Sequence, residues 1–138
     1  MEKILEIKDY SDFEEYSGME GFEIITTEQS IKLTIDSQQQ CCENWGYFWC
    51  NDDPQDFIGS TLLDVTLTDD ALNEAHLKDN NIDPSVDLNS ISFEGSIMFV
   101  NIETSIGTLQ FVAYNNHNGY YGHTARVECK QLNHTDSL

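Results

Sequence analysis

The feature that most limits the fold of this chain is a pair of strand-like runs, residues 96–103 and 108–114, joined by the short segment 104–107. Both runs are rich in β-branched and aromatic residues, which pack well on the pleated surface of a β-sheet. The short connection therefore predicts an antiparallel hairpin.

Other segments extend this β pattern. Residues 21–35 alternate on both sides of Glu28 and Gln29, which predicts a second hairpin. The aromatic-rich residues 41–50 favour a buried strand, and residues 61–68 and 123–131 have the composition of further strands. A turn with at most one helical turn is expected between residues 51 and 57. We therefore predict a β-rich core over residues 21–132.

Two segments have helical spacing instead. Tyr10, Phe13 and Tyr16 are three residues apart, and Gly18 follows, so an acidic helix is predicted over residues 8–17. A small helix is expected near residues 69–78, around Ala71, Leu72, Ala75 and Leu77. The fold class that follows is α+β, dominated by antiparallel β-sheet, with a frayed C-terminus at residues 133–138.

The length of 138 residues favours a single domain over residues 1–138. The N-terminal residues lack the apolar stretch of a signal peptide, and no run approaches the ~18 apolar residues of a membrane span. We therefore expect a soluble cytoplasmic protein, with no membrane partner.

The charge of the chain limits its partners. It has 25 Asp and Glu against 6 Lys and Arg, a formal net charge of −19. Nucleic acid is therefore a poor direct partner, because binding it requires many cations to replace counterions. A DNA duplex as long as this globule carries about 20 phosphate charges. The protein therefore has enough negative charge to act as a DNA mimic, which would bind a basic partner in place of DNA. Solubility is the alternative role for the same charge.

Two acidic clusters stand beside aromatic residues, an arrangement that protein-binding faces use for steering and anchoring. The alternative, which the sequence supports equally, is that these acidic residues only face solvent while the aromatic residues pack in the core. The candidate partner-binding residues are Asp12, Glu14, Glu15, Asp52, Asp53 and Asp56.

A possible metal site combines a cysteine pair with two histidines that flank a glycine-containing loop. Two thiolates and two imidazoles suit tetrahedral zinc, and the candidate ligands are Cys41, Cys42, His117 and His123. The spacing is atypical for zinc modules, so buried cysteines and ordinary loop histidines remain the alternative. A zinc ion here is expected to be structural. Cys50 and Cys129 are expected to be core residues.

No enzyme motif is present, and the acidic field raises the pKa of any thiol nucleophile, so no catalytic residue is expected. Two rival functions stay open. One is a sponge for a nucleotide signal, with Asn115, Asn116, Tyr120 and Tyr121 as pocket residues. The other is a zinc-dependent hydrolase with an open metal position at the histidine loop.

Three segments resemble a family of small acidic proteins of phages and mobile elements: CCENWGYFWC (41–50), FIGSTLLDVTLTD (57–69) and the run 95–127 that contains HNGYYGH. The resemblance covers about residues 21–132, and some members look like type II-A anti-CRISPRs. It implies a zinc-containing inhibitor of Cas9 with the metal held by Cys41, Cys42, His117 and His123.

Combined with the charge, the resemblance predicts a non-enzymatic inhibitor that acts in the bacterial host cytoplasm and occupies a basic nucleic-acid channel or the recognition lobe of Cas9. Such binding would obstruct the loading of target DNA, because the channel is positive in order to hold a nucleic-acid backbone.

Overall fold

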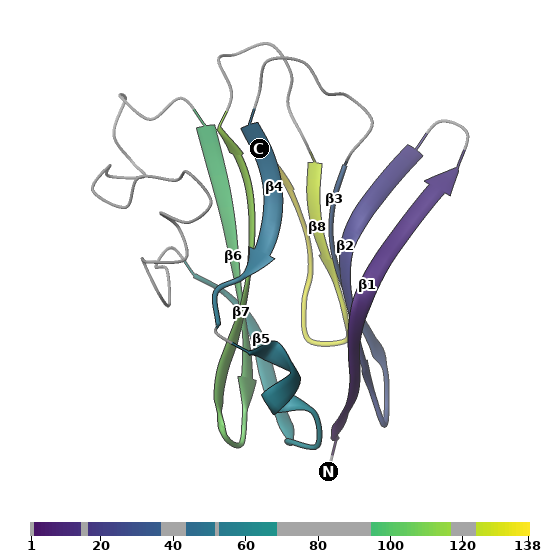
Figure 1. Ribbon diagram of the computed structural model, residues 1–138, viewed down its shortest axis with the longest axis vertical. Coiled ribbons are helices and arrows are strands. Elements are labelled where there is room, and N and C mark those ends of the chain that lie inside the picture. The colour runs from purple at the N-terminus through teal and green to yellow at the C-terminus, as the bar shows by residue number, and fades with distance from the viewer. Residues whose placement is uncertain (1, 15–16, 37–43, 52, 69–94, 117–123) are drawn as a thin grey trace.

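The computed structural model is a sandwich of two antiparallel β-sheets (Figure 1). It describes residues 2–14, 17–36, 44–51, 53–68, 95–116 and 124–138. No helix within these ranges is long and apolar enough to cross a membrane.

The first sheet has the strand order β1-β2-β3-β8-β9. Its strands are β1 (Ile4–Glu14), β2 (Ser17–Thr26), β3 (Ser30–Asp36), β8 (Thr124–Glu128) and β9 (Asn133–Ser137). The second sheet has the order β4-β7-β6-β5. It contains β4 (Asn44–Trp49), β5 (Leu62–Thr68), β6 (Gly95–Thr104) and β7 (Gly107–Asn116), and the short 3₁₀ helix η1 (Pro54–Phe57) lies between β4 and β5 in the chain.

Both predicted hairpins are confirmed. β6 and β7 pair from Gly95↔Asn116 to Thr104↔Gly107, and β2 and β3 pair on either side of the turn at residues 27–29. Gly107 has φ 141°, a conformation that favours glycine at the end of this tight turn. The strands expected within residues 41–50, 61–68 and 123–131 are confirmed over the bounds of β4, β5 and β8, and η1 supplies the expected helical turn.

Side chains from the facing sides of both sheets form the core. Ile24, Leu33 and Phe111 are fully buried within one cluster that both sheets share. Phe22 of β2 stacks on Trp49 of β4 with ring centroids 4.7 Å apart. This aromatic contact joins the sheets at the side where β4 lies opposite β2.

The α+β prediction is wrong, because residues 8–14 continue strand β1 where an acidic helix was expected. β1 pairs with β2 from Ile4↔Thr26 to Glu14↔Ser17 and buries Ile4 and Ile7 against the second sheet. Aromatic and β-branched residues suit a strand that has a partner, and tertiary pairing decides between the two conformations. The helix expected near residues 69–78 lies outside the described residues.

The C-terminal residues, expected to be frayed, form strand β9. β9 pairs with β8 from Thr124↔Ser137 to Glu128↔Asn133, and Leu138 is only 4% exposed. The backbone of these polar residues completes the first sheet, while the final leucine closes the core. Sheet pairing, which polar composition does not reveal, overrides the expectation for a chain end.

Candidate functional site

The four predicted zinc ligands, Cys41, Cys42, His117 and His123, lie outside the described residues. The strands that flank them are described. Asn44, which follows the cysteine segment, pairs with Asn116, which precedes the histidine segment. At the other ends of these segments, Ile35 pairs with Ala125. The pairing of β4 with β7 and of β3 with β8 thus brings the flanks of both segments together.

Elsewhere in the described ranges, no group of three or more His, Cys, Asp or Glu residues could hold a metal. Cys50 and Cys129 are both buried, which confirms their prediction as core residues. Burial raises the pKa of the Cys129 thiol, and nearby carboxylates add to the shift.

The two acidic clusters lie on neighbouring elements. Asp12 and Glu14 belong to β1, whereas Asp53 and Asp56 belong to the η1 segment. The Gln55 side chain donates a 3.1 Å hydrogen bond to the Ile7 carbonyl and so holds η1 against β1. Glu15 and Asp52 lie outside the described residues. Asp53 also caps η1 by accepting a hydrogen bond from the Gln55 amide, so part of its role is structural.

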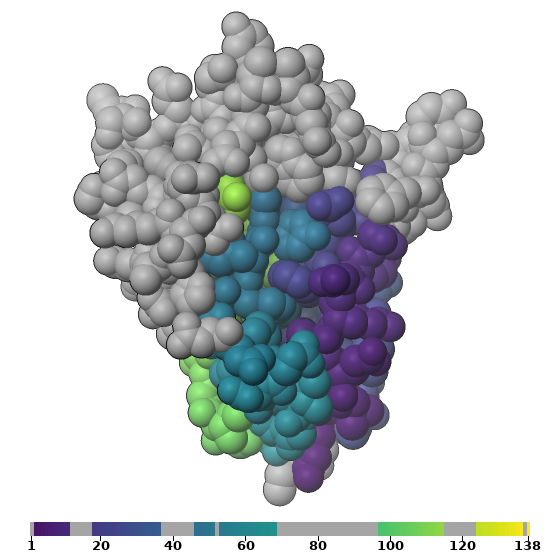
Figure 2. All heavy atoms as spheres, in the orientation of Figure 1, coloured from purple at the N-terminus to yellow at the C-terminus, as the bar shows by residue number. Residues whose placement is uncertain are grey.

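Further carboxylates that were not predicted as site residues join these clusters. Glu6 and Asp9 are exposed on β1, and Glu20 lies on the neighbouring β2. We call the group Asp9, Glu20, Asp53 and Asp56, together with Glu6 on the other face of β1, the acidic seam. In Figure 2, two of the elements that carry it, β1 (purple) and η1 (teal), lie next to each other, and β4 (blue) lies beside them. The register of β1 and β2, which composition alone does not give, would have been needed to find it.

Tyr47 of β4 faces the acidic seam from the second sheet. Burial raises the pKa of Tyr47 above its ordinary value, and the charges of Glu20 and Asp9 and a hydrogen bond to Glu20 raise it further. The hydroxyl therefore stays protonated at neutral pH and donates to Glu20. The seam thus approaches the junction between the two sheets.

The outer face of the first sheet is balanced in charge. Lys8 Nζ lies 3.5 Å from a Glu23 carboxylate oxygen, and Arg126 pairs with Glu128 at 3.7 Å. Lys32 lies over the Tyr10 ring, 5.1 Å from its centroid. Basic and acidic side chains therefore lie next to one another on this face, within β8 and between β1 and β2.

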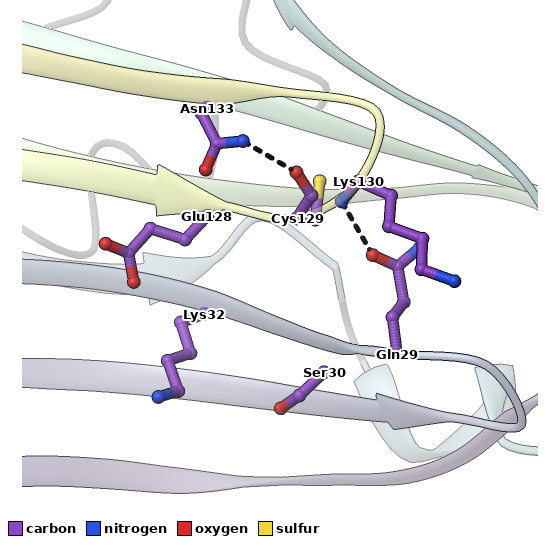
Figure 3. A pocket seen from close by; sticks show the side chains of 7 residues that line it. All are labelled: Gln29, Ser30, Lys32, Glu128, Cys129, Lys130 and Asn133. Carbon is purple, nitrogen blue, oxygen red and sulfur yellow. Dashed lines mark hydrogen bonds between the residues drawn. The ribbon is translucent and has the colours of Figure 1, made fainter.

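A shallow depression opens on that face, and Figure 3 shows the side chains around it. The Lys130 amide donates to the Gln29 side chain at 2.8 Å, and the Asn133 side chain donates to the Cys129 carbonyl at 3.1 Å. The first bond ties the turn after β8 to the turn before β3, and the second lies within the connection between β8 and β9. The lining groups thus hold the sheet together, and we assign no ligand to the depression. The residues around it are Gln29, Ser30, Lys32, Glu128, Cys129, Lys130 and Asn133.

Of the pocket residues expected for a nucleotide sponge, Asn115 and Asn116 end strand β7. Tyr120 and Tyr121 lie outside the described residues. The described geometry therefore adds no argument for that rival.

Comparison with protein families matches residues 2–127 to DUF7448, a domain of unknown function. The match begins two residues before β1 and ends within β8, so it includes strands of both sheets and excludes β9. Comparison with curated proteins and with solved structures gave no match. The chain, a two-sheet antiparallel sandwich with an acidic seam, belongs to the DUF7448 family.

Proposed function

We propose that this protein is a non-enzymatic inhibitor that binds a basic nucleic-acid-binding surface of Cas9. The single observation that carries the proposal is the net charge of −19 combined with two acidic clusters on adjacent elements, β1 and η1. The choice of Cas9 comes from the sequence resemblance, and the charge accounts for how binding would occur.

The seam offers a row of carboxylates of useful length. From Glu6 to Asp9, β1 advances three residues, which corresponds to roughly 10 Å of extended strand. This distance exceeds the ~8 Å Debye length at physiological salt, so a basic channel would sense several separate charges along it. Such a field accelerates encounter with a positive surface and makes the association rate depend on salt.

A structural zinc ion held by Cys41, Cys42, His117 and His123 is part of the proposal. The donor set suits zinc, and the pairs Asn44↔Asn116 and Ile35↔Ala125 support a shared site. Metal analysis of the purified protein should find about one zinc per chain, and a chelator should lower the melting temperature. Protein without bound metal that melts at the same temperature would remove zinc from the proposal.

The decisive experiment measures binding of the protein to the Cas9–guide complex and the resulting loss of target-DNA loading. We expect the association rate to fall about tenfold or more between 0.1 and 0.5 M salt. The triple variant Glu6→Gln/Asp9→Asn/Asp56→Asn should slow association about tenfold at low salt, with little change in melting temperature, because these side chains are exposed.

A matched control removes the same number of charges away from the seam. Glu28→Gln/Glu128→Gln/Asp136→Asn alters a turn and the far side of the first sheet. If this control slows association as much as the seam variant, total charge governs binding and the seam has no special role. Absence of binding to Cas9 at every salt concentration would reject the proposed function.

A further inference from the structure

Two strands at the edges of different sheets begin with the same pattern. β1 starts with Ile4-Leu5-Glu6-Ile7, and β5 starts with Leu62-Leu63-Asp64-Val65. In each, the first and fourth side chains are buried, whereas the leucine at the second position is 54% exposed in β1 and 62% exposed in β5. An exposed carboxylate follows each of these leucines.

A shift in strand register coincides with each exposed leucine. The pairing of β1 with β2 shifts between Ile4 and Glu6, and that of β5 with β6 shifts between Leu62 and Asp64. Leu5 and Leu63 are therefore the extra residues of two β-bulges, a device that redirects side chains. Both bulges turn an apolar side chain away from the core.

The two bulges lie on either side of one junction between the sheets. Lys3 bridges Thr61, the Ile4 amide donates to the Ser60 carbonyl at 3.0 Å, and the Leu62 amide donates to the Glu2 carbonyl at 2.8 Å. Leu5 lies two residues after Lys3 along β1, and Leu63 lies two residues after Thr61 along β5. Because the two segments run antiparallel, these positions lie on opposite sides of the Lys3–Thr61 bridge, and a length of four residues of strand, roughly 13 Å, separates them. Alternation places both on the outer side, because Ile4 and Leu62 face the core.

Two more exposed apolar side chains join them. Ile58 precedes Gly59, whose amide donates to the Ile4 carbonyl at 2.8 Å. Ile106 follows Ser105, whose amide donates to the Thr61 carbonyl at 2.9 Å, and is itself 61% exposed. Isoleucine is also an unusual choice for the tip of a two-residue hairpin, where Asn, Asp and Gly are preferred.

We call Leu5, Ile58, Leu63 and Ile106 the apolar corner. Among the large apolar side chains that are exposed in the described ranges, only Leu67 lies outside it. The corner occupies the end of the sandwich near the N-terminus, where η1, the start of β5 and the β6–β7 hairpin lie together (Figure 1). A concentration of exposed apolar groups on so polar a chain marks an interaction surface.

The charges around the corner indicate what kind of partner can bind there. Exposed Glu6, Asp56 and Asp64 stand beside Leu5, Ile58 and Leu63. A second copy of this chain would bring the same carboxylates into contact with their like, at a net charge of −19 on each molecule. A complementary surface has apolar side chains at its centre and Lys or Arg at its rim.

We propose that the apolar corner is a docking surface for a basic protein that presents apolar side chains between lysines or arginines. The inference rests on the proposed function and deepens it, since the partner is the same basic protein. The seam carboxylates set the association rate, and the four apolar side chains set the lifetime of the complex.

The test uses the full chain and the Cas9–guide complex. The variant Leu63→Ser/Ile106→Ser should raise the dissociation rate about tenfold and leave the association rate within about twofold, because interface truncations act mostly on dissociation. The increase should be the same at 0.1 and 0.5 M salt, unlike the effect of the seam variant. Leu67→Ser, on the same strand but outside the corner, is the matched control and should change neither rate.

Folding is checked for each variant by its melting temperature. Because Leu63 and Ile106 are more than half exposed, their truncation should shift it little. A second variant, Leu5→Lys, places a cation on the other bulge and should also hasten dissociation. If the wild type binds and these variants dissociate at the wild-type rate, the proposal for the apolar corner is overturned and the proposed function is not. No wild-type binding overturns both the corner and the proposed function.

Discussion

Gly21 occupies a position in β2 that tolerates no side chain. A Cβ atom built on it would lie 1.9 Å from the Leu33 carbonyl oxygen on β3, far inside van der Waals contact. Gly46 on β4 is also confined, but the neighbour there is the Tyr114 hydroxyl at 2.8 Å, the end of a side chain that can move. The two glycines therefore differ in how much their surroundings can adjust.

We predict that Gly21→Ala destabilises the protein by about 3 kcal/mol, near the upper end for overpacking, because backbone must shift. Gly46→Ala should cost about 1 kcal/mol or less. Urea unfolding of both variants measures the difference. Equal stability of Gly21→Ala and the wild type would contradict the close approach of β2 to β3.

Tyr47 leads to a prediction about alkaline pH. Its pKa is raised in the folded state by burial, then by Glu20 and Asp9, and the pKa of Tyr114 is raised by burial as well. In the unfolded chain these phenols ionise near pH ~10. Their stabilising contribution is therefore complete below pH ~10 and is lost as the pH rises through the folded pKa.

The free energy of unfolding should consequently fall above pH ~10, and Tyr47→Phe should show a smaller fall than the wild type over the same interval. Urea titrations from neutral to alkaline pH measure both curves, and the neutral values give the cost of losing the Tyr47 hydroxyl. Parallel curves for the two proteins would show that Tyr47 does not contribute.

Among single residues, burial of Cys50 and Cys129 could be predicted from sequence, because free cysteines within strand patterns usually pack in cores. Gly21 gave no such signal. Its constraint comes from a carbonyl twelve residues away, and only the pairing of β2 with β3 brings that group close. Contacts across strands decide the role of such residues.

At the scale of elements, the two hairpins could be predicted from strand-like runs with short connections, whereas the conformations of the two ends of the chain could not. Aromatic residues three apart in residues 8–17 share one face of a helix but alternate between the faces of a strand, so the spacing favours a helix, and β2 supplies the partner that selects the strand. Residues 133–137 are polar, yet β8 needs a neighbour on its outer side. In both cases pairing energy outweighs the local pattern.

Strand β9 provides the element-scale prediction. Removal of residues 133–138 deletes an edge strand and the buried Leu138, so the free energy of unfolding should fall by at least about 2 kcal/mol. Thermal or urea unfolding of the truncated chain measures the loss. The variant His134→Ala keeps the strand and serves as the control. A truncated chain as stable as the wild type would mean that these residues are frayed after all.

At the scale of the whole molecule, self-repulsion among carboxylates opposes folding. A net charge of −19 on 138 residues acts over a Debye length of ~30 Å at 0.01 M salt but only ~3 Å at 1 M. The melting temperature should therefore rise by several degrees as NaCl is increased from about 0.01 to 0.5 M. KCl at matched ionic strength should give the same increase, because the effect is screening. A melting temperature independent of salt would show that repulsion is negligible.

The candidate site divides along the same line as the fold. The acidic clusters and the cysteine and histidine pairs could be identified as residue types, because charge and ligand chemistry belong to side chains. Which of these residues lie close together in space could not be predicted. For example, η1 contacts β1 through the hydrogen bond from Gln55 to Ile7, two residues that are 48 positions apart in the sequence. The apolar corner likewise depends on two bulges whose register is invisible in composition.

Alternation and charge, which are local properties, are set by the amino-acid sequence itself: the strands of the two hairpins, their buried faces and the excess of carboxylates. The tertiary structure alone decided that the acidic N-terminal segment is a strand, that the polar C-terminus completes a sheet, and that the two edge strands β1 and β5 meet. The physical reason is that strand pairing is satisfied by backbone groups of distant residues. Its free energy therefore belongs to the pair of segments and is absent from either segment alone.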